Sequence, residues 1–434
     1  MILAFNRHAG LRALAHITVN AMSYKRSIQP HSTSKFFKKE AKKLFKQYRE
    51  SNTVALELFN DFHPEQTSLK EAKLSDAQFV VARHYGQKTW ARLLKTVESN
   101  KQFRLLEKAF QSRNKKGIRQ LLNKYHILFE RLLLRTAVLY GDIHMVEYLY
   151  ELGARDIQDA LGQAIYSCSK DITDFLVSKG GNMEGNDRYG LLGSSACELQ
   201  NINSLKFTLG YRTQPVPKEV LFEYFMILVG TYVRNPKGKH ECINELISQG
   251  LVLDDTPIMA FYQGRIDLLE KHLKKDPDLI HRKFSLKEIF CKPFFHDNTD
   301  GLHLTPLEGT TLLHLAIEYD ERDIMQWLVE NGADVNAIST IDEDGFGGHT
   351  PLFHTTVTFI PEDISKAAFL LENGADPNHR CSIRKQLKYM SKRHMEDTFE
   401  YKNVSPISFA EQWQGGQHDS IETLKLLKKL GGVV

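Results

Sequence analysis

The chain of 434 residues is 42% hydrophobic and 25% charged, which is ordinary for a folded protein, and its length exceeds that of one compact core. Its net charge of +4 is uneven, because residues 1–50 hold 11 Lys or Arg and only two acids, Glu40 and Glu50. No apolar run approaches the roughly 20 residues of a membrane-spanning helix, and five scattered cysteines without a C-x-x-C pair argue against a disulfide framework and favour a cytoplasmic protein.

Residues 1–34 are predicted to be a disordered leader. They contain arginines and no acid, so an organellar transit peptide is the alternative. The following stretch, "KFFKKEAKKLFKQYRE" (35–50), is predicted to be an amphipathic helix. One side holds its apolar residues, which are Phe37, Ala41, Leu44, Phe45 and Tyr48. We expect this side to pack on other N-terminal helices, although such a helix can also bind an acidic membrane or phosphates.

Residues 74–98 are predicted to form a helix, a turn at Gly86 and a second helix. The second helix carries Lys88, Arg92 and Lys95, so the segment can be taken for a DNA-reading helix-turn-helix. Its apolar residues form a packing face, however: Trp90, Leu93, Leu94 and Val97. Residues 35–102 are therefore predicted to be a helical cap on a repeat array, which needs such caps.

A repeat begins near residue 103. After Ala137, Ala164 and Ala316, a leucine follows at +12 and a glycine at +16. A small residue lets two helices approach closely, and a glycine after a helix supplies its left-handed cap. Weaker copies fill the gaps, and nine stacked helix pairs are predicted between residues 103 and 434.

Four phrases in the later repeats closely resemble ankyrin repeats: "GTTLLHLA" (309–316), "NGADVNA" (331–337), "TPLF" (350–353) and "NGADPN" (373–378). The units are degenerate to about residue 308 and clearer over 309–434. The chain also resembles uncharacterised bacterial ankyrin-repeat proteins. The resemblance implies an all-α ankyrin-repeat solenoid that acts as a protein–protein interaction scaffold, without enzymatic activity.

The stretch "DEDGFGGHTPLFHT" (342–355) has three chemical interpretations, and each lacks a necessary residue. A phosphate loop needs Lys-Ser/Thr after its last glycine, and a calcium loop needs Glu where Phe353 stands. His349 and His354 are five apart, so they are expected on different faces of any helix. Residues 339–348 are therefore predicted to be a lengthened connector between two repeats, with the next helix starting at Thr350-Pro351. His314 is likewise predicted to be structural, with its ring hydrogen-bonded to a neighbouring loop.

Two insertions leave room for an enzyme. Residues 281–309 contain a set that could bind zinc, namely Cys291, His296, Asp297 and His303, but the spacing matches no familiar finger. Residues 379–404 form a basic, irregular insertion with Cys381 and His394. We predict no catalytic residue, no metal site and no cofactor, and keep an enzyme at either insertion as the alternative.

In ankyrin proteins the concave face usually holds the partner, and its exposed positions lie two and three residues after the small residue. Those offsets predict partner contacts at Tyr140, Tyr166, Tyr262, Glu318 and Tyr319, with Thr310 and His349 on the connecting fingers. Tyrosine anchors interfaces well, because it offers a large apolar area and one polar tip. Alternatively, these rings fill grooves between helices. The predicted partner is another protein, and nucleic acid binding through the basic N-terminal region is the alternative.

Overall fold

The computed structural model describes most of the chain: residues 26, 28–29, 31–63, 71–126, 132–187, 190–290, 303–388, 396–413 and 418–434. The chain divides into two compact units, Met1–Ala164 with Asp171–Gly180, and Ile165–Lys170 with Gly181–Val434. Among the described helices, none has both the length and the apolar character to cross a bilayer. The predicted leader falls almost entirely outside the described residues.

The first unit begins with three helices that bury a shared apolar core: α2 (Ser34–Arg49), α3 (Thr53–Phe62) and α4 (Leu74–His84). Phe37 of α2 packs edge-on against Tyr85 with ring centroids 4.9 Å apart, and Tyr48 stacks on Phe59 at 3.7 Å. The apolar side of α2 thus packs inside the protein, as predicted, and its lysines stay on the outside. An acidic membrane would therefore meet the lysines rather than the apolar side of this helix.

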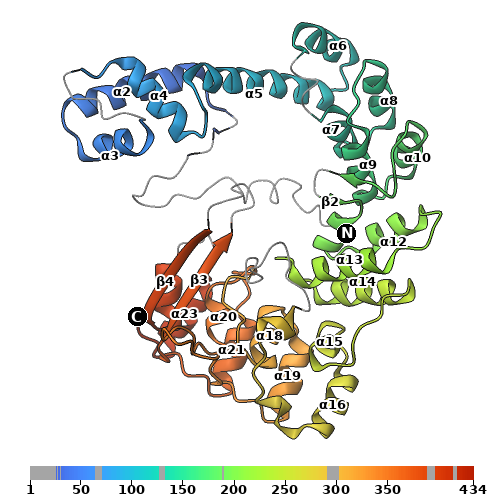
Figure 1. The fold of residues 1–434 in the computed structure, drawn as a ribbon, viewed down its shortest axis with the longest axis vertical. Helices are drawn as coiled ribbons and strands as arrows, with labels where there is room; N and C mark the ends of the chain where they lie inside the picture. The colour runs from blue at the N-terminus through green and yellow to red at the C-terminus, as the bar shows by residue number, and fades with distance from the viewer. Residues whose placement is uncertain are drawn as a thin grey trace. The chain divides into compact units, whose positions relative to one another are not determined.

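Helix α5 (Trp90–Gln111) is one continuous helix of 22 residues, so the predicted boundary at residue 102 falls inside it. No glycine or proline interrupts this stretch, and nothing therefore ends the helix early. Leu93 and Val97 in its first half are buried with α2, α3 and α4, which matches the predicted packing face. Its second half pairs with α6 (Lys115–Lys124), at the other end of the helix (Figure 1).

Consecutive helix pairs make up the rest of the array, as the repeat predicts. Most of the residues of two pairs belong to the first unit: α7 (Leu133–Leu139) with α8 (Ile143–Glu151), and α9 (Ile157–Tyr166) with α10 (Lys170–Ser178). Their stacking is carried in part by Asp156, whose carboxylate accepts hydrogen bonds of 3.0 Å from two backbone N–H groups at the start of α7. The predicted cap glycines Gly153, Gly180 and Gly332 all have positive φ, between +93° and +104°.

In the second unit the described pairs follow the same order along the chain. They are α11 (Ser194–Glu198) with α12 (Ile202–Gly210), α13 (Lys218–Gly230) with α14 (Pro236–Ser248), α15 (Pro257–Tyr262) with α16 (Ile266–Lys275), α18 (Leu312–Glu318) with α19 (Arg322–Glu330), α20 (Phe353–Thr356) with α21 (Ser365–Glu372), and α22 (Pro406–Gln412) with α23 (Ile421–Lys429). Short elements connect them: β1 (Asn186–Asp187), β2 (Gly190–Leu191), η2 (Pro277–Ile280) and α17 (Leu286–Ile289). One apolar core runs from α11 to α23.

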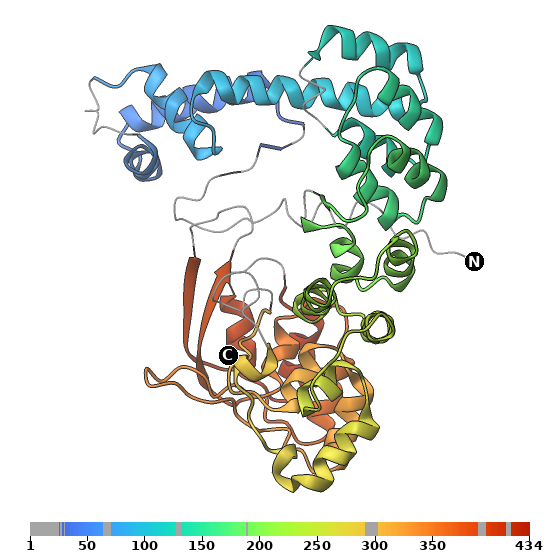
Figure 2. The same ribbon diagram turned by 45° about the vertical axis from the view of Figure 1, so that its right-hand side comes forward.

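The insertion at 379–404 is not irregular, which corrects the expectation from the sequence. It contains an antiparallel hairpin of β3 (Cys381–Lys388) and β4 (Glu396–Val404), with Ile383 opposite Tyr401 and Arg384 opposite Glu400. Ile383 and Tyr401 are buried in a separate apolar cluster with Phe353 of α20 and Phe409 of α22. The hairpin therefore lies against the last helices (Figures 1 and 2), and the unit is not purely α-helical.

Candidate functional site

Two of the tyrosines predicted to be exposed are core residues. Tyr262 and Tyr319 are only 0% and 2% exposed, and their rings meet edge-on with centroids 5.5 Å apart. The Tyr262 hydroxyl donates to the Ile289 carbonyl at 3.1 Å, and the Tyr319 hydroxyl donates to the Val229 carbonyl at 2.7 Å. The expectation of exposure is wrong here, because segments from other repeats cover both rings and use their hydroxyls to satisfy buried carbonyls.

Glu318 is also buried, at the centre of a charged network. Its Oε1 accepts from Arg234 at 2.7 Å and lies 3.1 Å from Nδ1 of His303, while its Oε2 lies 2.9 Å from Nδ1 of His354. Burial alone would raise the pKa of this carboxyl, but Arg234, His303 and His354 outweigh it and hold the pKa well below its ordinary value. Glu318 is therefore ionised and bonded inside the protein. The prediction that it contacts a partner is wrong.

A second buried ion pair involves Glu321, in the turn between α18 and α19. Lys239 of α14 and Glu321 approach at 2.7 Å, and His240 lies 2.8 Å from the same carboxylate oxygen. The Lys239 ammonium stands 4.8 Å from the centre of the Tyr319 ring. Burial lowers the pKa of Lys239 despite this partner, and Lys239 and His240 outweigh burial to lower the pKa of Glu321. The Glu318 network therefore joins the connector before α14 to the end of α18, and the Glu321 pair joins α14 to the turn after α18.

The two finger residues predicted to contact a partner, Thr310 and His349, are buried as well. The Thr310 hydroxyl donates to the Leu307 carbonyl at 2.7 Å, and Nε2 of His349 donates to the Pro306 carbonyl at 3.0 Å. His349 also joins His314, whose Nε2 donates to the His349 carbonyl at 3.1 Å. The structural role predicted for His314 is thereby confirmed, while the exposed position expected for His349 is wrong.

The lengthened connector at 342–348 is scaffold, as predicted. Oδ1 of Asp342 accepts from the backbone N–H groups of Asp344 and Phe346 at 3.0 and 2.8 Å, which closes a tight turn. Arg384 of β3 pairs with Asp344 at 2.9 Å and with Asp342 at 3.4 Å. The two aspartates that suggested a cation loop therefore bind a guanidinium of the hairpin.

Neither insertion assembles a reactive site among the described residues. His303 belongs to the Glu318 network, and Cys291, His296, Asp297 and His394 lie outside the described residues. Cys381 lies in β3, where burial raises the pKa of its thiol to about 12 and so keeps it protonated. In the part of the chain that the structure describes, no three His, Cys, Asp or Glu side chains stand together as metal ligands would.

The second unit contains two exposed tyrosines and a half-buried phenylalanine beside one of them. We call Tyr166, Tyr232 and Phe359 the aromatic strip. Tyr166 and Tyr232 are 38% and 42% exposed, and the rings of Tyr232 and Phe359 lie 6.1 Å apart. Contacts within the protein hold two residues of the strip in place. Ser204 donates to the Tyr166 carbonyl at 2.8 Å, and Arg234 lies 5.0 Å from the centre of the Phe359 ring.

Glu198 of α11 gives the aromatic strip an acidic neighbour. Its pKa is raised by burial, and the pKa of Tyr232 is raised by burial, by the Glu198 charge and by Tyr166. The Thr231 hydroxyl fixes the adjacent backbone by donating to the Glu198 carbonyl at 2.7 Å. The strip therefore offers hydroxyls and one carboxylate beside apolar rings.

Tyr232 and Phe359 are not among the contact residues predicted from the sequence. The repeat around 219–250 has no alanine at the small position, so the offset from alanine predicts no contact residue there. Gly230 can fill that position, and the residue two further along is Tyr232. In the first unit, the predicted contact residue Tyr140 is 40% exposed and rests against Phe110 at 6.4 Å. Tyr140 and Tyr166 are thus the predicted contact residues that remain accessible.

Comparison with known proteins agrees with the arrangement of helix pairs. The family model for ankyrin repeats (3 copies) matches residues 232–381. A protein of Acanthamoeba polyphaga mimivirus described as an ankyrin repeat protein is 30% identical over 101 residues, which are 23% of this chain and 12% of that viral protein. The crystal structure of the human ASB11 ankyrin repeat domain is 16% identical, with a TM-score of 0.26 over 62% of this chain and 96% of that chain. The family match shows ankyrin repeats over residues 232–381, and the described helix pairs before and after that stretch follow one another in the same order.

Proposed function

We propose that this chain is a scaffold that binds another protein, and that in the second unit the partner contacts the aromatic strip. Ankyrin repeats are generally protein–protein interaction modules. One observation carries the proposal to these residues: Tyr166 and Tyr232 keep more than a third of their surface exposed while their neighbours are held by hydrogen bonds.

Rigidity supports a binding role for the strip. An interface gains most from aromatic residues that lose little conformational entropy when the partner arrives. Arg234 holds the carbonyls of Thr231 and Val233 at 2.7 and 3.2 Å, on either side of Tyr232. The Tyr232 backbone is therefore fixed before binding, and only its ring has to settle against the partner.

The chemistry of the strip suggests what its partner offers. Apolar side chains would cover the faces of Tyr232 and Phe359, and hydrogen-bond donors would meet the tyrosine hydroxyls and Glu198. In the first unit, Tyr140 stays a proposed contact residue. The buried side chains of Tyr262, Tyr319 and Glu318 support the site from inside and touch no partner in this proposal.

The proposal is tested with the double variant Tyr166→Ala/Tyr232→Ala. A protein captured from native lysate by the wild-type chain is purified and titrated against both chains. Each tyrosine that anchors an interface contributes about 2 kcal/mol, so we expect the double variant to bind at least about a hundredfold more weakly.

Val252→Ser is the matched control, because this residue is apolar and 79% exposed but lies in the connector between α14 and α15. It should bind the partner as the wild type does. Unchanged circular dichroism of the double variant would exclude unfolding as the cause. Equal binding by the wild type and the double variant would refute a contact at the strip.

A further inference from the structure

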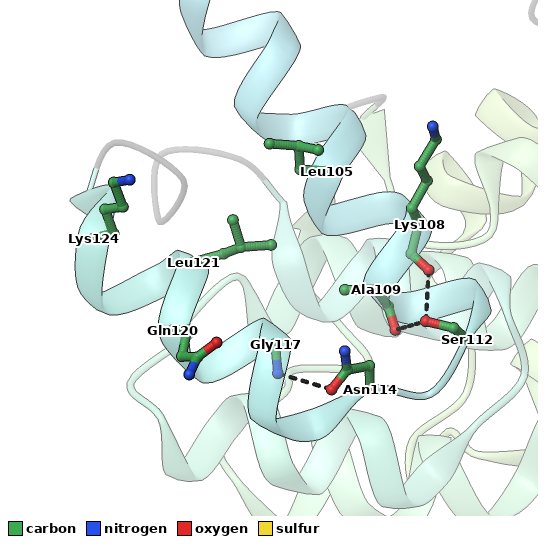
Figure 3. A pocket seen from close by; sticks show the side chains of 9 residues that line it. All are labelled: Leu105, Lys108, Ala109, Ser112, Asn114, Gly117, Gln120, Leu121 and Lys124. Carbon is green, nitrogen blue, oxygen red and sulfur yellow. Dashed lines mark hydrogen bonds between the residues drawn. The ribbon is translucent and has the colours of Figure 1, made fainter.

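The first helix pair has an apolar groove on its surface. A hollow of about 450 Å³ lies between the second half of α5 and α6 (Figure 3). Leu105 of α5 and Leu121 of α6 enter it from the two helices, with Ala109 and Gly117 between them. Leu105 is 44% exposed, so its side chain is accessible in the groove.

The opposite side of the same two helices is covered by the next pair. Leu106 and Phe110 of α5 and Ile118 and Leu122 of α6 are buried, and Phe110 meets the ring of Tyr140 after α7. The helices α2, α3 and α4 bury only the first half of α5. In a repeat array each pair normally packs between two others. The groove is thus the stacking side of the first pair that no described element covers.

The surroundings of the groove are strongly basic. Residues 101–126 hold eight Lys or Arg and a single acid, Glu107. Lys108 and Lys124 form part of the lining, and no carboxylate of the described residues pairs with either one. Two cations beside an apolar floor favour an occupant that combines apolar side chains with carboxylates.

Two polar side chains of the lining, Ser112 and Asn114, already make hydrogen bonds within the protein. Oδ1 of Asn114 accepts from the Gly117 N–H at 2.9 Å, and the Ser112 hydroxyl donates to the Lys108 and Ala109 carbonyls at 2.9 and 3.2 Å, as the dashed lines in Figure 3 mark. These bonds hold the turn between α5 and α6. The side chains left to contact an occupant are therefore the two leucines, the two lysines and Gln120.

We propose that this groove binds an acidic amphipathic helix of a partner protein. Apolar side chains of that helix would pack on Leu105, Ala109 and Leu121, and its carboxylates would pair with Lys108 and Lys124. A helix is the natural occupant, because the stacking side of a repeat is shaped to take another helix. This surface is a second one, separate in sequence and composition from the aromatic strip.

Charge argues against two other occupants. Residues 1–50 of this chain hold 11 basic and two acidic residues, so they would be repelled by the lysines of the groove. Two copies of this chain joined groove to groove would bring Lys108 and Lys124 of both copies together. A partner with the opposite charge meets neither penalty.

The test uses the full chain and a fluorescein-labelled peptide of about 16 residues, with leucines three and four apart and glutamates elsewhere, long enough to be partly helical. Binding is followed by fluorescence anisotropy. We expect Lys108→Glu/Lys124→Glu, and separately Leu105→Asn, to weaken binding at least roughly tenfold. Lys116→Glu is the control for charge, because it reverses one lysine charge on α6 outside the lining and should weaken binding less than about threefold.

Four results would overturn the proposal. Equal losses in Lys116→Glu and Lys108→Glu/Lys124→Glu would mean general charge attraction. Equal binding of a matched peptide with lysine in place of glutamate would remove the charge argument. A dimer in sedimentation that Leu105→Asn dissociates would make a second copy the occupant. No binding by the wild type would remove the site. The variant Tyr166→Ala/Tyr232→Ala should bind the peptide normally, so failure at the groove and failure at the aromatic strip can be told apart.

Discussion

Arg234 donates to Oε1 of Glu318 at 2.7 Å, although 84 residues separate the two in the chain and both side chains are almost fully buried. Nε of Arg234 also donates to the Glu318 carbonyl at 2.6 Å. This ion pair joins the connector between α13 and α14 to the end of α18. Because Tyr232 lies in that connector, the pair also holds the backbone from which the aromatic strip projects.

Replacing Glu318 by Gln should destabilise the second unit strongly. The change keeps the shape of the side chain but leaves the Arg234 cation buried without its counter-charge. Breaking a buried ion pair on one side costs about 3–5 kcal/mol. Hydrogen exchange of the backbone amides in α18 and α19 measures this loss, and the first unit provides an internal reference because its amides should exchange as before.

Asp267→Asn is the matched control for this prediction. Asp267 pairs with Arg265 at 2.6 Å, but both side chains are more than half exposed. Solvent screens such an exposed pair, so it contributes little to stability. If Glu318→Gln were no more harmful than Asp267→Asn, the buried network would not stabilise the fold.

The buried histidines predict that the second unit loses stability as the pH falls below about 6.5. Burial, followed by the charge of His354, holds the pKa of His314 down at about 3, and burial keeps the pKa of His349 well below its ordinary value. The unfolded chain therefore takes up protons that the folded chain excludes. Each excluded proton costs up to about 1.4 kcal/mol per pH unit between the unfolded pKa and the folded one.

The hydrogen bonds of His314 explain this preference for the neutral ring. Its Nε2 donates to the His349 carbonyl, so its Nδ1 accepts from Thr311 and has no room for a second proton. Urea unfolding at pH 7, 6 and 5 should show falling midpoints for the wild type and a shallower fall for His314→Gln. His144→Gln, at an exposed histidine, should follow the wild type, and identical slopes in all three chains would contradict the prediction.

The buried carboxylates of the same unit add a second pH range, at lower pH, in which the fold loses stability. Despite their burial, the pKa values of Glu318 and Glu321 are lowered by their cationic neighbours. The stability that they contribute is complete above pH 4.5 and is lost as the pH falls through their lower folded pKa values. Glu318→Gln should therefore remove part of the acid-induced loss below pH 4.5, and an unchanged acid transition would contradict this.

The repeat spacing predicted where the helices lie in the sequence, but not which of their side chains are buried by other segments. The offsets located α7, α9, α15 and α18 and the cap glycines, because these depend on residues close together in the sequence. The same offsets failed for Tyr262 and Tyr319, because the segments that cover them come from residues near 229, 289 and 303. An offset along one helix carries no information about such distant partners.

The β3–β4 hairpin escaped prediction for a different reason. A half-buried strand is recognised by alternating apolar and polar residues. In β3 the inward positions include Ile383 but also Lys385, which is 0% exposed. A buried lysine at an inward position hides the alternation, and the basic character of the segment then suggested an irregular loop.

The cysteines should differ widely in reactivity. Cys168 is exposed, whereas burial raises the pKa of the Cys242 and Cys381 thiols to about 12 and that of Cys197 well above its ordinary value. Only the thiolate reacts quickly with alkylating reagents. At pH 8 a thiol of pKa 12 is ionised to about one part in ten thousand. Brief iodoacetamide treatment followed by peptide mapping should label Cys168 far faster than these three, and comparable labelling of Cys242 would contradict their burial.

Two glycines of the lengthened connector should respond differently to substitution by alanine. Gly347 has a φ of +118°, its N–H donates to the Ser382 carbonyl at 2.7 Å, and a Cβ there would collide with the Thr340 carbonyl. Gly345 has a φ of +84° with nothing within 4 Å of the position of a Cβ. Gly345→Ala bears only the backbone strain, about 1 kcal/mol, whereas Gly347→Ala must also push the connector backbone away from Thr340 and should cost about 3 kcal/mol or more. Urea unfolding of the two variants measures the difference. Equal losses would mean that the connector shifts freely and that its contact with the hairpin contributes little to the fold.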